Sequence, residues 1–270
     1  MTEKLLHEDR IMCNKYSKET VLENIKSAKE IIANAAVKSG RKPSDVTLLA
    51  ATKTVDADTI NFAIDNGIEC IGENRVQELL QKYDDINKDK VDIHFIGRLQ
   101  TNKVKYIADK VSMIHSVDSA KLAKEIDRQC AKLGKVMDVL VEVNIGGEES
   151  KGGICPDELE KFLTEISCFP NIKVVGLMCI PPKIENAVSC DGCGDFDAVC
   201  DKTFENTKKS YKNKAFFEKI MKLFLDISQK KLDNIYMQVL SMGMSDDFEE
   251  AVEEGATIVR IGRGLFGARN

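Results

Sequence analysis

Lys53 comes directly after a short apolar run, in the sequence LLAATKT, that reads as a buried strand. Side chains at the carboxyl ends of strands in α/β barrels face the place where ligands bind. Beside apolar walls, a lysine amine can have a lowered pKa and can form a Schiff base with an aldehyde. By position alone a solvated loop lysine is the commoner case, because lysine side chains are rarely buried. Lys53 is therefore a candidate nucleophile.

A charged residue, Arg260, interrupts the final apolar run, ATIVRIG. A buried guanidinium is costly unless it is paired with a carboxylate or bound to a ligand. The turn that follows contains Gly262 and Arg263, and Ser241 ends the preceding apolar run. Glycine lets the backbone approach a ligand closely, and successive N–H groups can bind an anion. These residues predict a phosphate site between the last two strands, with a structural ion pair as the alternative for Arg260.

Other polar residues in or after the apolar runs have structural explanations that compete with a functional one. Asn74 could hydrogen-bond a ring hydroxyl, but it is also a good helix N-cap with Gln77 as its capping-box partner. Ser245 is likewise a good N-cap, a role that can coexist with a ligand contact. His94 and His115 lie within strands, where a core or lining role is commoner than acid–base catalysis.

Strands and helices alternate along the chain, which implies parallel βαβ units. Eight strands favour a closed (β/α)8 TIM barrel over an open doubly wound sheet. Little sequence follows the last strand, so we expect helix 18–39 to cover the gap left by a missing or very short closing helix. The expected strands are 46–51, 68–72, 92–97, 113–116, 137–144, 173–178, 237–240 and 257–261. The expected helices are 18–39, 57–65, 75–86, 100–108, 119–133, 156–168, 216–231 and 246–254.

The predicted domain organisation is a flexible extension at 1–17 and a single barrel at 18–270. A polar, turn-rich insertion at about 183–214 interrupts the barrel and is longer than a normal barrel loop. The insertion holds Cys190, Cys193 and Cys200, but no second cysteine pair or nearby histidine completes a tetrahedral zinc site. We therefore expect an exposed insertion with reduced thiols and no metal.

The composition is that of an ordinary globular protein, with 43% hydrophobic and 31% charged residues. A net charge of −5 gives no general attraction to nucleic acid or to anionic lipid. The polar N-terminal sequence does not resemble a signal peptide, and no apolar run is long enough to span a bilayer. Nine cysteines do not suggest a disulfide framework. We expect a cytoplasmic monomer that binds neither nucleic acid nor membrane.

The chain resembles the pyridoxal phosphate homeostasis protein family from about residue 18 to residue 270. The resemblance is specific because several motifs occur in order and at plausible spacing. These motifs are ATKT, IGENRVQE, HFIGRLQTNK, SVDS, NIGGEESKGGI, GLMCIPP, LSMGMSDDFEEAV and VRIGRGLFGAR.

This resemblance implies a fold-type III barrel, like the N-terminal domain of alanine racemase, that binds pyridoxal 5′-phosphate (PLP). It implies that Lys53 forms a Schiff base with PLP, that Arg260 faces the pyridine nitrogen and that Asn74 lies near the ring hydroxyl.

The resemblance also assigns the phosphate group to Ser241 and to the backbone N–H groups of Gly262 and Arg263. Many relatives carry Thr or Ser where this chain has Arg263, so a charge-assisted contact could replace a hydroxyl group here. The family offers no explanation for the insertion.

By the same resemblance, the protein is a carrier that buffers PLP or delivers it to apo-enzymes, without amino-acid turnover. Racemisation in alanine racemase uses a tyrosine from a following domain, and we expect that domain to be absent here. Arg260 opposite the ring nitrogen would also weaken the electron sink. A low-activity PLP-dependent amino-acid racemase is one alternative, and a sugar-phosphate barrel enzyme with an aldolase-type Lys53 is another.

Overall fold

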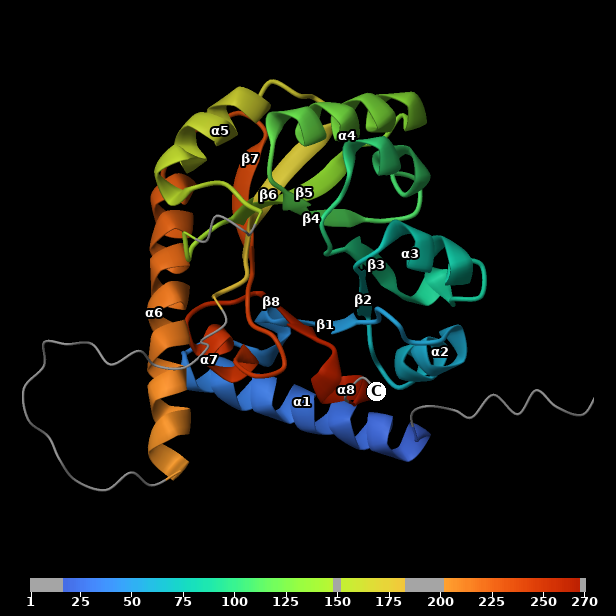
Figure 1. Ribbon diagram of the computed structural model, residues 1–270, viewed down its shortest axis with the longest axis vertical. Coiled ribbons are helices and arrows are strands. Elements are labelled where there is room, and N and C mark those ends of the chain that lie inside the picture. The colour runs from blue at the N-terminus through green and yellow to red at the C-terminus, as the bar shows by residue number, and fades with distance from the viewer. Residues whose placement is uncertain (1–16, 148–151, 183–201, 268–270) are drawn as a thin grey trace, which may run out of the picture.

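The computed structural model describes residues 17–147, 152–182 and 202–267. Its centre is a closed barrel of eight parallel strands in sequence order, with β8 pairing back onto β1 (Figure 1). The predicted (β/α)8 barrel is confirmed. The strands are β1 (Thr47–Ala51), β2 (Cys70–Glu73), β3 (Asp92–Phe95), β4 (Met113–Val117), β5 (Met137–Val143), β6 (Ile172–Cys179), β7 (Ile235–Ser241) and β8 (Ile258–Ile261).

Helices cover the outside of the barrel, and two segments depart strongly from the sequence prediction. The helices are α1 (Lys18–Lys38), α2 (Ala57–Asp65), α3 (Val76–Lys82), α4 (Ala120–Leu133), α5 (Leu159–Ile166), α6 (Lys202–Ser228), α7 (Phe248–Glu253) and α8 (Arg263–Phe266). The segment expected as helix 100–108 forms only the 3-10 turn η3 (Thr101–Tyr106). Helix α6 starts at Lys202 rather than at 216, so the second part of the expected insertion is helical. Cys190, Cys193 and Cys200 lie outside the described residues.

The N-terminal helix α1 closes the side of the barrel that the short helix α8 leaves open. It packs against α7 and α8, as Figure 1 shows. Its buried face comprises residues at helical spacing, among them Val21, Ile25 and Ile32. Asn24 Nδ2 also donates a hydrogen bond to Leu265 O at 3.0 Å. The expected role of this helix is therefore confirmed.

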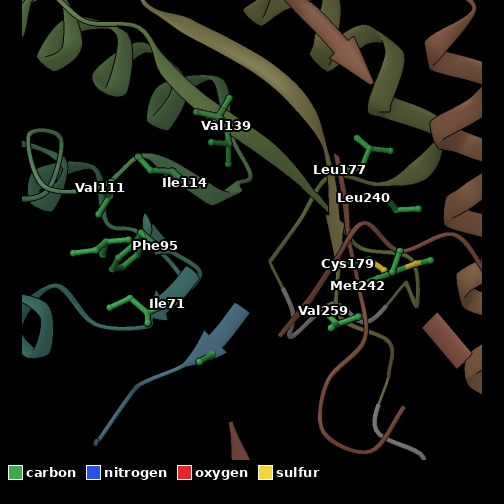
Figure 2. Packing of buried hydrophobic residues seen from close by; sticks show 14 of the residues in the cluster. Ile71, Phe95, Val111, Ile114, Val139, Leu177, Cys179, Leu240, Met242 and Val259 are labelled. Carbon is green, nitrogen blue, oxygen red and sulfur yellow. The ribbon is translucent and has the colours of Figure 1, made fainter. Parts of the chain in front are cut away.

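The main hydrophobic core lies between the strands and the surrounding helices. Figure 2 shows part of this core, with labelled side chains such as Ile71, Ile114 and Val259 from strands around the barrel. Two smaller clusters form around Leu49 and around Leu140. The cluster around Leu49 includes Ile258 and Cys70. Because alternate residues of a strand share a face, Ile258 shares its face with Arg260, which places a charged residue in an otherwise apolar layer.

The described part of the chain contains no helix that is long and apolar enough to cross a membrane. Within the same residues, no group of three or more histidine, cysteine or acidic side chains could hold a metal ion.

Candidate functional site

A cavity of about 610 Å³ opens at the carboxyl ends of the strands. This is the position at which (β/α)8 barrels carry their sites, and the volume is in the range that holds a small ligand. Five of the six residues predicted to form the site line this cavity: Lys53, Asn74, Arg260, Gly262 and Arg263. Other lining residues include Arg98, Glu142, Asn213, Met244, Ser245, Asp246 and Asp247. Residues that are as much as 210 positions apart in sequence therefore meet in one cavity.

Lys53 is held at the cavity by a tightly constrained turn between β1 and α2. Thr52 N donates to Gly72 O at 3.0 Å, and Val55 N donates to Thr52 O at 3.0 Å. Thr54 has a positive φ of 64°, a conformation that is uncommon for a threonine. The Lys82 ammonium donates to Thr52 O at 2.8 Å and to Val55 O at 3.2 Å. The turn that carries Lys53 is therefore fixed from both of its ends.

Asn74 follows β2 and lies beside Gly97, which follows β3, and it does not cap a helix. Helix α3 begins at Val76, its N-cap is Arg75, and no side chain forms the cap hydrogen bond. The expected N-cap role of Asn74 is therefore wrong, and its side chain remains available to the cavity. Its backbone carbonyl packs so closely on Gly97 that a Cβ atom at Gly97 would overlap it.

Arg260 is buried, being only 5% exposed, and still reaches the cavity. Its Nη1 donates to Ser241 Oγ at 2.7 Å and its Nη2 donates to Cys179 O at 3.0 Å. Within the described residues no carboxylate forms an ion pair with it. Burial lowers the pKa of Arg260, with Cys179, Asp247 and Glu142 acting in the opposite direction. A guanidinium remains charged and can only donate hydrogen bonds, so Arg260 is a fixed donor at the cavity wall.

Ser241, predicted to contact phosphate, lies behind Arg260 and is not among the lining residues. It is fully buried, and its hydroxyl lies 3.2 Å from His115 Nδ1 as well as beside Arg260. His115 Nε2 lies 3.0 Å from His94 Nδ1, and both rings are buried as expected. Burial lowers the pKa of His94 to about 4 and, together with His94 and Arg260, lowers the pKa of His115 well below its usual value. Both histidines are therefore neutral near pH 7.

A different serine, Ser245, occupies the cavity rim after β7. Its hydroxyl accepts a hydrogen bond from Gly264 N at 3.1 Å, which ties the β7 loop to α8. Arg263 Nη2 lies 2.7 Å from Asp246 Oδ2, and both side chains are mostly exposed. A hydroxyl, a guanidinium and the glycine turn at Gly262 thus lie together at one end of the cavity.

Acidic residues also line the cavity, and one of them, Glu142, was missed when the sequence was considered alone. Burial, helped by Asp118, raises the pKa of Glu142, while Arg260 and Arg98 act against it. Burial also raises the pKa of Asp247, although the Met244 amide donates to its carboxylate at 2.6 Å. The available signal for Glu142 was a charged residue within an apolar strand, the pattern that identified Arg260.

The cavity brings together the groups needed to hold a phosphorylated aromatic aldehyde. A lysine amine can react with an aldehyde, a guanidinium can donate to a ring acceptor, and the Ser245 and Arg263 end can bind an anion. The fold and this set of groups define a class of barrel proteins. Residues 22–270 match the family model described as "Alanine racemase, N-terminal domain".

Individual relatives are similar over almost their whole length. The chain is 42% identical to the pyridoxal phosphate homeostasis protein of Aquifex aeolicus, over 92% of this chain and 97% of the relative. It is 36% identical to the protein of the same name from Pseudomonas aeruginosa, over 93% of this chain and 96% of the relative. The structure of PipY from Synechococcus elongatus PCC7942 with PLP bound matches with a TM-score of 0.70 and 29% identity, covering 92% of this chain and 100% of PipY. The chain belongs to the pyridoxal phosphate homeostasis protein family.

Proposed function

We propose that the protein binds PLP in the cavity at the carboxyl ends of the strands and serves as a reversible store or donor of this cofactor. The observation that carries the proposal is the convergence of Lys53, Arg260 and Arg263 on one cavity. Among the described lining residues Lys53 is the one lysine. The PLP bound to PipY and the names of the relatives support the same ligand.

Each proposed contact uses a group that suits one part of PLP. Lys53 would hold the aldehyde carbon as a Schiff base, and Arg260 would donate to the ring nitrogen. Asn74 would lie near the ring hydroxyl. PLP supplies an aldehyde and an electron-withdrawing ring when it is bound.

The phosphate end is proposed at Gly262, Arg263 and Ser245. A Cβ atom at Gly262 would sit 3.3 Å from Ala51 O, so glycine keeps this turn close to β1. We revise the phosphate role first assigned to Ser241, because its hydroxyl is buried behind Arg260 and Ser245 lines the cavity instead.

Storage suits the site better than amino-acid chemistry because of Arg260. Its guanidinium does not readily give up a proton, so a ring nitrogen facing it stays unprotonated and withdraws electrons weakly. We therefore propose that the protein has negligible amino-acid turnover and passes PLP to apo-enzymes that require it.

Borohydride trapping tests the binding site. Purified protein is incubated with PLP, reduced, digested and mapped by mass spectrometry, and the pyridoxyl group is expected on Lys53. Lys222→Arg, at an exposed position on α6, is the matched control and should label normally. Label on another lysine in a folded Lys53→Arg variant as well as in the wild type would refute the assignment.

Transfer and turnover are tested on the same protein. Holo-protein mixed with an apo-PLP enzyme should restore its activity, measured against a free-PLP control at equal concentration. Amino-acid turnover that disappears in Lys53→Ala would instead identify the protein as an enzyme, such as a racemase.

A further inference from the structure

A string of buried polar side chains crosses the barrel interior behind Arg260. It runs from Arg260 on β8 to Ser241 on β7, then to His115 on β4 and His94 on β3. Cys70 on β2 lies at its far end, with Sγ 3.5 Å from His94 Nδ1. The histidines and the serine are at most 6% exposed, so these polar side chains lie in an environment where unmatched polar atoms are costly.

The protons in this string can be assigned from its cationic end. A guanidinium has no acceptor, so Ser241 Oγ must accept from Arg260. Within the described residues, the other partner of this hydroxyl is His115 Nδ1. A buried hydroxyl that does not donate loses a hydrogen bond, so the Ser241 proton points at His115 Nδ1.

The two histidine tautomers then follow. Neutral His115 accepts at Nδ1, so its proton is on Nε2 and points at His94 Nδ1, 3.0 Å away. His94 accepts at Nδ1 and therefore carries its proton on Nε2. The Cys70 thiol stays protonated because burial raises its pKa, and it can donate weakly to the same nitrogen of His94.

We propose that Ser241, His115 and His94 are positioning residues, which form a one-way hydrogen-bond chain that aims the Arg260 guanidinium into the cavity. Ser241 at the end of this hydrogen-bond chain holds Nη1 of the guanidinium, and the Cys179 carbonyl holds Nη2, so that two contacts fix the group without a carboxylate. A carboxylate partner would compete with a ligand for the same cation, whereas a serine hydroxyl is neutral and forms no ion pair with it. The role toward the pyridine nitrogen rests on the proposed function, but the direction of the chain does not.

Histidine tautomers provide a test that needs no cofactor. The full chain is labelled with ¹⁵N-histidine, and the signals of two of its three histidines are assigned with His94→Gln and His115→Gln. Both rings should be neutral with the proton on Nε2 from pH 8 to about pH 5.5. An Nδ1–H tautomer at either ring, or protonation of either ring near pH 6.5, would overturn the proposed direction.

Ser241 variants test whether the chain acts on the ligand. Ser241→Ala should weaken PLP binding about tenfold, and Ser241→Thr, which keeps the hydroxyl, should recover part of this loss. Ser112→Ala is the matched control, because it removes a serine hydroxyl that donates to Ile93 O just before β4, outside the chain. Its affinity should stay within about twofold of the wild type.

The outcomes separate the two proposals. Equal PLP affinity for wild type and folded Ser241→Ala would refute the positioning role. If Ser241→Ala does not fold, the tautomers of the wild type still decide the direction of the chain. A wild-type protein that fails to bind PLP would refute the proposed function and leave the tautomer result standing.

Discussion

Lys82 Nζ on α3 lies 2.7 Å from Glu73 Oε1 on β2, and the carboxylate is fully buried. Thr52 Oγ1 donates to the same oxygen, while Glu73 Oε2 has no hydrogen-bond partner within the described residues. Burial raises the pKa of Glu73, and the ion pair with Lys82 and the hydrogen bond from Thr52 lower it in return. The same ammonium holds the turn that carries Lys53. Removing Lys82 should therefore affect both stability and the site.

Lys82→Met should lower the free energy of unfolding by about 3–5 kcal/mol at pH 7, because it leaves an uncompensated buried carboxylate. Urea denaturation measures this loss. The loss of stability should decrease as the pH falls, because the Glu73 carboxyl has a raised pKa in the folded protein and takes up its proton there first. Lys90→Met is the control, because the Lys90–Asp65 pair is exposed and should contribute less than about 1 kcal/mol. A Lys82→Met variant as stable as Lys90→Met would contradict this account.

His94 should make the protein sensitive to acid. Its folded pKa of about 4 lies below its usual value of 6.5, so the unfolded chain binds the proton first as the pH falls. This proton uptake should lower the free energy of unfolding by about 2 kcal/mol at pH 5 and should have no effect at pH 8. His115 should add to the loss at pH 5. Buried carboxyl groups with raised pKa values, such as Glu142 and Asp247, act in the opposite direction.

The measurement for His94 is therefore a difference between two proteins. Urea denaturation of wild type and His94→Gln at pH 8 and pH 5 should show the gap in stability narrowing by about 2 kcal/mol on acidification. A gap that is the same at both pH values would mean that His94 is not held neutral.

Gly97→Ala should displace Asn74, because a Cβ atom there would overlap the Asn74 carbonyl, which is backbone and cannot swing aside. We expect a loss of about 1–3 kcal/mol of stability and about tenfold weaker PLP binding. The control is Gly152→Ala, also in the cavity wall, where the new methyl group would sit 3.3 Å from the tip of the Asp118 side chain. Comparable affinities for the two variants would argue against a contact between Asn74 and the ligand.

Arg263→Ala should weaken the binding of PLP several-fold while leaving that of pyridoxal, which lacks the phosphate, almost unchanged. The effect should decrease at high salt because the side chain is mostly exposed. Asp246→Asn releases the guanidinium from its ion pair and should strengthen PLP binding or leave it unchanged. Equal losses for PLP and pyridoxal in Arg263→Ala would place the phosphate elsewhere.

The barrel could be predicted from the sequence because its strands are apolar runs that alternate with amphipathic segments. Arg260 was identifiable as unusual because a charge inside such a run is costly. Segment 100–108 did not form an α-helix. Its turn instead uses hydrogen bonds three residues apart, such as Lys103 N to Gln100 O. Few of its side chains reach the core: Val104, Ile107 and Ala108 are buried, but Asn102, Lys105 and Tyr106 are exposed, so little burial is available to stabilise a helix.

The hydrogen bonds within the site could not be predicted, because the residues that form them come from distant strands. Ser241 and His115 are 126 positions apart, and nothing in their local sequences links them. The sequence likewise offered both Ser241, at the end of a strand, and Ser245, as an N-cap that could also contact a ligand, and the family resemblance assigned the phosphate to Ser241. In the structure Ser241 lies behind Arg260, with its hydroxyl 2.7 Å from Arg260 Nη1, and Ser245 lines the cavity.

The packing of α1 against α7 and α8 also constrains how the chain can be synthesised. The hydrogen bond from Asn24 to Leu265 joins residues 241 positions apart. During translation, α1 is made first among the described elements, and the part of its surface that packs against α7 and α8 lacks these partners until the end of the barrel leaves the ribosome. Loop-closure entropy makes such distant contacts slow to form. The nascent barrel must therefore stay open for most of its synthesis. During that time part of the apolar surface of α1 is exposed, and a chaperone could bind it.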